Sequence, residues 1–224
     1  MAAQVLTFED VRIAVATALK GVGIASVAVG QATMDNAINK AMIRAVSEAP
    51  IPEYAASLYT VAPLAVTAGV ASHPADVLIP LAVEVSGGKT VRKPLMETLR
   101  VELANLPGTN EYCYSFAGMK TVIRPQVAQA NLHYLAVPPA LSGPTDPFPL
   151  SPALFNVVVL AASLTASEKM ANVDPQQVAR IVGQYDAAIG YLNGNTNKEL
   201  LAAWLTQSAR SGLAGTGGGV QQGG

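Results

Sequence analysis

Two histidines and one cysteine are the residues best suited to chemistry in this chain of 224 residues. His73 precedes Pro74 in an expected loop, and His133 lies in the middle of an expected strand. Neither histidine has a second His or Cys at the spacing that a zinc site requires. We therefore expect no metal site and no bound cofactor.

Cys113 is the candidate nucleophile, and His133 would serve as its base if their two strands were neighbours. A cysteine nucleophile needs surroundings that stabilise the thiolate and a third group that orients the base. Cys113 instead lies between Tyr112 and Tyr114, a pattern typical of a small packing residue in a strand. A small soluble enzyme with a Cys/His site is therefore an alternative, and a protein that is not an enzyme is the main expectation.

The glycines and carboxylates give no further catalytic motif. Residues 21–23 lack the third glycine and the preceding strand of a dinucleotide-binding turn, and residues 217–219 lack the Lys-Ser/Thr that follows a phosphate-binding loop. No motif pairs two carboxylates for acid–base catalysis either. The acidic residues of the central region are dispersed, as Glu97, Glu102 and Glu111 show.

The composition favours an oligomer. Half of the chain is apolar and only 13% is charged, against about a quarter in a typical soluble domain. A monomer with so little charge would expose large apolar patches, which usually mark interaction sites. The net charge of −1 includes no basic stripe for binding duplex DNA through its phosphates.

Cysteine usage and hydropathy indicate a cytoplasmic origin. A single cysteine excludes an internal disulfide framework, and no secretory signal is evident. The most apolar stretch, residues 154–166, is too short to span a bilayer, so we expect a buried helix there and no membrane contact.

Capping residues and helical periodicity predict the helices that would hold these side chains. Thr7 caps the first helix, and Ser151-Pro152 and Asp174-Pro175 are typical helix starts. The last two of these helices are expected to pair as an antiparallel hairpin, with a clean apolar stripe from Val178 to Leu192 on the second. The expected helices are 8–19, 33–47, 152–171, 175–192 and 196–210.

The middle of the chain has strand patterns. Residues 58–61 and 64–67 are separated by Pro63, which predicts an edge strand, a bulge or two short strands. The segment 72–85 leads into a strand on which Leu81, Val83 and Val85 share one face. Residues 94–103 form a short helix or a turn, and 131–137 another strand. Between them, residues 111–125 predict a hairpin that turns at Gly118, with three alternating aromatic residues on one hydrophobic face.

This order of elements resembles the head-to-tail connector adaptors of tailed bacteriophages. The likeness covers roughly residues 5–195 and is carried by the helix at Phe8, the helix with residues 36–44, and the segment 73–85, in which Pro-Ala-Asp leads into a strand. The aromatic hairpin with Gly118 and the helix pair that opens at Ser151-Pro152 complete it.

The resemblance implies a virion structural protein whose copies, commonly twelve, form a ring that docks beneath the capsid portal. The ring would offer a platform for tail or nozzle/terminator proteins and let double-stranded DNA pass without sequence readout. It would belong to the neck of the virion after assembly in the host cytoplasm. A head-completion or tail-terminator ring is the nearest alternative.

The resemblance also assigns the contact with the portal to the C-terminal segment, residues 204–224. The portal-docking residues would then be Trp204, Leu205, Arg210, Leu213, Val220 and Gln221.

We expect an α+β fold: a helical bundle with an inserted small antiparallel β-region and an extended C-terminal tail. The expected segments are N-terminal helices at 1–56, the β-rich insertion at 57–140, a helical hairpin that completes the bundle at 141–195, and a C-terminal helix with a Gly-rich docking tail at 196–224.

Overall fold

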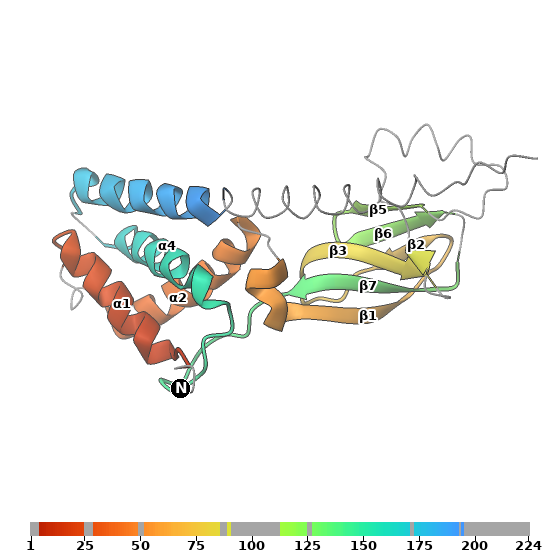
Figure 1. Ribbon diagram of the computed structural model, residues 1–224, viewed down its shortest axis with the longest axis horizontal. Coiled ribbons are helices and arrows are strands. Elements are labelled where there is room, and N and C mark those ends of the chain that lie inside the picture. The colour runs from red at the N-terminus through yellow and green to blue at the C-terminus, as the bar shows by residue number, and fades with distance from the viewer. Residues whose placement is uncertain are drawn as a thin grey trace, which may run out of the picture.

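The protein has an α+β fold, with helices gathered at one end and strands at the other (Figure 1). This is a computed structural model, and it describes residues 5–24, 29–48, 52–85, 89–90, 113–124, 127–170, 173–192 and 194. The helix expected at 196–210, the element expected at 94–103 and the C-terminal tail lie outside the described residues.

The first two helices begin and pack as their sequences predict. Helix α1 spans Phe8–Gly21, and α2 spans Gln31–Glu48. Thr7 and Asp10 form a capping box at the start of α1, in which each side chain accepts a hydrogen bond from the other residue's backbone N–H. A bidentate ion pair from Arg12 to Asp35, with N–O distances of 2.7 and 2.8 Å, joins the two helices.

A central helix completes the helical core. After a short 3₁₀ helix, η3 (Pro152–Leu154), the chain continues as α4, Phe155–Ser167, which is buried on nearly all sides. Helices α1 and α2 both pack on α4, and a last helix at 175–192 joins the same core through Ile181, Tyr185 and Leu192. The predicted stripe of that last helix is wrong at Val182, which is 37% exposed.

One antiparallel sheet carries the longest strands, in the order β1-β7-β3-β4. The 3₁₀ helix η2 (Pro52–Leu58) leads directly into β1, and Pro63 lies inside that strand without breaking it. The sheet tolerates this proline because β1 is an edge strand and one side of it donates to no neighbour. The strands are β1 (Tyr59–Ala65), β3 (Val77–Val85), β4 (Lys89–Thr90) and β7 (Gln129–Ala136).

A smaller sheet, in the order β2-β6-β5, packs against the first. It contains the predicted hairpin, in which Gly118 has the positive φ of 59° that the turn requires. The loop expected at His73 and Pro74 is confirmed, since it separates β2, which ends at Ser72, from β3. The strands are β2 (Val70–Ser72), β5 (Cys113–Ala117) and β6 (Lys120–Arg124).

The described residues form two hydrophobic cores. Buried side chains of both sheets, among them Val83, Ile123 and Leu132, form the core of the β-region. Leu135 of β7 instead packs into the helical core and so ties the two ends of the molecule together. The four segment boundaries expected from the sequence stay a prediction.

Candidate functional site

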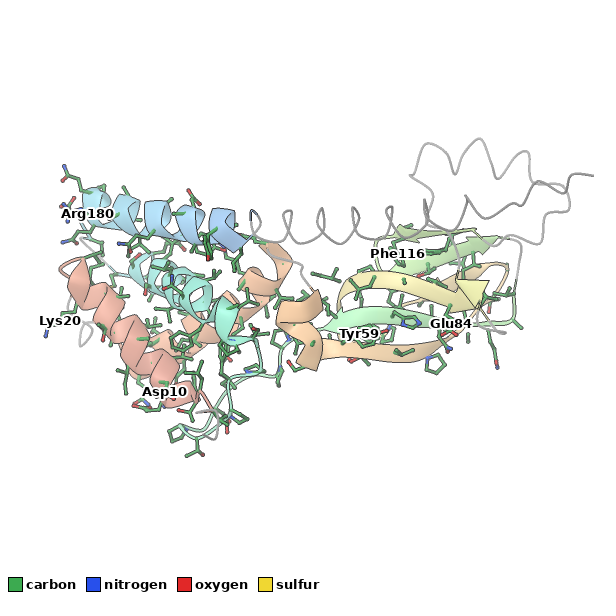
Figure 2. The ribbon with its side chains drawn as sticks, in the orientation of Figure 1. Asp10, Lys20, Tyr59, Glu84, Phe116 and Arg180 are labelled. Atoms are coloured by element: carbon green, nitrogen blue, oxygen red, sulfur yellow. The ribbon has the colours of Figure 1, made fainter. Side chains whose placement is uncertain are left out.

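Three polar side chains meet on the face of the larger sheet that the smaller sheet does not cover. Tyr59 of β1, His133 of β7 and Glu84 of β3 come from adjacent strands (Figure 2 labels Tyr59 and Glu84). The Tyr59 hydroxyl lies 2.5 Å from His133 Nδ1, and His133 Nε2 lies 3.3 Å from a Glu84 carboxylate oxygen. We call this set the Tyr-His-Glu cluster.

The cluster orients an imidazole ring between a phenol and a carboxylate. A neutral imidazole has one donor and one acceptor nitrogen. With Nε2–H donating to Glu84, Nδ1 accepts the hydroxyl proton of Tyr59. Cross-strand polar contacts of this kind also hold neighbouring strands in register, so the cluster fixes the edge strand β1 against the sheet.

An open pocket of about 620 Å³ lies where the helical end meets the sheets. Its walls are mostly apolar and come from the Pro-rich chain that returns from β7 to η3, including Leu141, Phe148 and Leu150. The Asn39 side chain holds this returning chain by donating to the Leu141 carbonyl at 3.1 Å and accepting from the Leu141 N–H at 2.8 Å. We call this cavity the junction pocket.

Asp146 gives the junction pocket its negative charge. Backbone N–H groups of Ser142 and Gly143 each donate to its Oδ2 at 2.8 Å, and these hydrogen bonds lower the pKa of the Asp146 carboxyl. The carboxylate is therefore ionised at neutral pH. Its other oxygen, Oδ1, accepts no hydrogen bond from the residues that the structure describes.

A second pocket, of about 260 Å³, lies between α2 and α4. Lys40 and Lys169 line it together with the hydroxyls of Thr33 and Thr165. This makes it a polar, cationic hollow, but all of its charge comes from exposed lysines.

The structure separates the residues of the proposed Cys/His site. Cys113 is in β5 and His133 in β7, and these strands belong to different sheets. The ring nitrogens of His133 instead face Tyr59 and Glu84. The condition for a Cys113–His133 pair, neighbouring strands, is therefore not met.

His73 is part of the packing of the smaller sheet. Its Nε2 contacts the Thr121 hydroxyl at 2.8 Å, and the ring meets Phe116 edge-on. Burial lowers the pKa of His73, and its Nδ1 has no hydrogen-bond partner in the described part of the chain. Within the described ranges no cluster of three His, Cys, Asp or Glu residues is arranged to hold a metal ion.

The predicted portal-docking residues, from Trp204 to Gln221, lie outside the described residues, so their role stays a prediction. The comparison with known protein families covers most of the chain, including Trp204, Leu205 and Arg210. The sequence model of the SU10 adaptor protein family matches residues 6–210. The chain belongs to the SU10 adaptor protein family. SU10 adaptors are a phage head-to-tail adaptor family, so the resemblance seen in the sequence is confirmed.

Membership of the SU10 adaptor family indicates a structural role in joining the phage head to the tail, and a place in the virion. No curated protein matches this SU10 adaptor in sequence. In the described part of the chain, none of the helices has the length and apolar character needed to cross a membrane.

Neither the Tyr-His-Glu cluster nor the junction pocket is predictable from the sequence. Tyr59, Glu84 and His133 are far apart in the chain, and only the strand register places them together. Asp146 lies in a Pro-rich segment with no regular periodicity. The dense prolines around it were the one signal of a rigid surface loop.

Proposed function

We propose that this SU10 adaptor is a ring-forming connector of the virion neck that joins the capsid portal to the tail and lets double-stranded DNA pass through its bore. The observation that carries the proposal is the family match over residues 6–210. Assembly from identical copies is proposed on two grounds, the low charge of the chain and the surface that it exposes.

Exposed apolar side chains support assembly. On the outer face of the edge strand β1, Tyr59 and Val61 are 47% and 46% exposed. On the helical end, Ile13 of α1 and Tyr191 of the last helix are 58% and 70% exposed. Apolar surface on several sides of one protein suits a ring, because each copy in a ring uses two different faces for its two neighbours.

The lack of strong basic surface suits DNA passage. Phosphate contacts from Lys and Arg supply most of the affinity of proteins for duplex DNA. With a net charge of −1, the chain would not hold the DNA tightly. We therefore propose that the bore guides DNA without sequence readout.

We further propose that residues 196–224, with Trp204 and Leu205 first, dock on the portal, and that the ring offers a platform for tail or nozzle/terminator proteins. Co-sedimentation of the full-length protein with purified portal, and separately with tail-end proteins, tests this arrangement. Binding to portal supports a connector. Binding to tail-end proteins alone would point to a tail-terminator ring, and binding to neither would contradict the proposal.

Deletion of residues 211–224 separates docking from folding. We expect the shortened chain to keep its circular dichroism spectrum and its assembly state while its portal binding weakens in a pull-down, because a Gly-rich segment adds little to a folded core. Unchanged portal binding would remove the tail from the docking surface.

A further inference from the structure

The turn of the β5–β6 hairpin presents an apolar side chain beside a positive charge. Met119 is 53% exposed at the tip, and Lys120 next to it is also exposed. The tip is held in place, because the His73 N–H donates to the Met119 carbonyl at 2.9 Å. Lys120 makes no ion pair with any residue that the structure describes.

The junction pocket has the complementary properties. Its walls are apolar, with Leu141, Phe148 and Leu150 below the surface, and Asp146 supplies a carboxylate with one oxygen left to accept. Methionine is unbranched and flexible, and it fills irregular apolar hollows well. A methionine with a lysine directly after it is therefore complementary to this pocket in apolar character and in charge.

The two features lie on different sides of the molecule. Figure 1 shows β5 and β6 along the upper side of the β-region, and the chain from β7 to η3 along the lower side of the junction with the helices. A single copy cannot bring such surfaces together, but neighbouring copies can. A contact between two different faces of identical copies is the heterologous kind that closes into a ring.

We propose that Met119 of one copy inserts into the junction pocket of the next copy, where the Lys120 ammonium pairs with the Asp146 carboxylate. This contact rests on the ring proposed above and names the surfaces that form it. Met119 is the apolar anchor of the contact. The ion pair sets its register, because a charge pair at the edge of an interface contributes specificity more than affinity.

Cysteine cross-linking of the full-length protein tests the contact. The background variant is Cys113→Ser, which removes the only native thiol. In that background, Met119→Cys is combined with Ala140→Cys, an exposed position on the pocket wall. Mild oxidation should give a covalent ladder of dimers, trimers and larger species. Each single variant should stop at the dimer.

The matched control replaces Ala140→Cys by Thr17→Cys, on the exposed face of α1, and should give no ladder beyond the dimer. A native mass spectrum of the unmodified protein is recorded in parallel. If the wild type is assembled but the double-cysteine variant gives no ladder, the proposed contact is refuted and the ring proposal stands. A wild type that is strictly monomeric would overturn the ring as well.

A second measurement does not depend on disulfide geometry. The double variant Met119→Ser/Lys120→Glu changes two exposed residues, so the fold should persist by circular dichroism. The protein concentration for half-assembly should rise about tenfold or more, as expected when the anchor of an interface is lost. Gln184→Ser, at an exposed position of the last helix that no proposed contact uses, should leave it unchanged. An unchanged half-assembly concentration in the hairpin variant, or a larger rise for Gln184→Ser, would refute the proposal.

Discussion

Truncation of Leu132 should destabilise the β-region and leave the helical end folded. The Leu132 side chain is completely buried between the two sheets, among Val83 and Ile123, and has no contact role in the helical core. Leu→Ala at such a site costs the transfer energy of the lost methyl and methylene groups plus the cavity left behind. Together these amount to about 2–5 kcal/mol.

Hydrogen exchange followed by mass spectrometry measures the loss of local stability in each region of the Leu132→Ala variant. A loss of about 3 kcal/mol in the β-region should speed the slowest exchanging amides of β3 and β7 about 100-fold. The amides of α2 and α4 should keep their rates within about threefold, because local unfolding exposes only the cooperative unit that contains the substitution.

Ile38→Ala is the matched control, since Ile38 is completely buried in the helical core. It should speed exchange in α2 and α4 and spare the β-region. Equal acceleration of both ends by either variant would show one cooperative unit. It would also refute the proposal that residues 57–140 form a separate insertion.

Three further perturbations test individual contacts. Asp35→Ala should lower the free energy of unfolding, measured in urea, by about 1.5–3 kcal/mol, because it leaves the largely buried Arg12 guanidinium without its bidentate partner. A loss below about 0.5 kcal/mol, the size expected for a surface ion pair, would contradict this prediction. Burial and the hydrogen bond to Glu48 raise the pKa of Tyr185 above its ordinary value of 10.0, so the contribution of this group to stability should be constant below pH 10 and be lost above it, and Tyr185→Phe should reduce that loss. Burial lowers the pKa of His73 below its ordinary value of 6.5, so the melting temperature should fall as the pH drops below 6.5, and His73→Gln should flatten that dependence.

Local signals were sufficient to predict most helices and the hairpin. Thr7 with Asp10 closes a capping box, and Gly118 takes the positive φ that a hairpin turn needs, so each element is specified within a few residues of sequence. Pro63 was compatible with three outcomes, and only the position of β1 at the edge of the sheet decides among them.

Features that depend on pairing between distant segments were not predictable. His133 had no neighbour in sequence, and its partners Tyr59 and Glu84 come from strands on either side of β7. Val182 fits the helical stripe but is exposed, because periodicity identifies a face and not which part of it a neighbouring helix covers. The junction pocket likewise depends on contacts between distant segments, such as the two hydrogen bonds of Asn39 in α2 with Leu141 of the returning chain.

Electron cryomicroscopy of the purified full-length protein tests the central claim most directly, that the copies complete one another's surfaces. We predict closed rings with a single copy number, in which the β5–β6 turn of each copy meets the β7–η3 chain of the next. Single particles of one copy at micromolar concentration, with or without portal present, would contradict it.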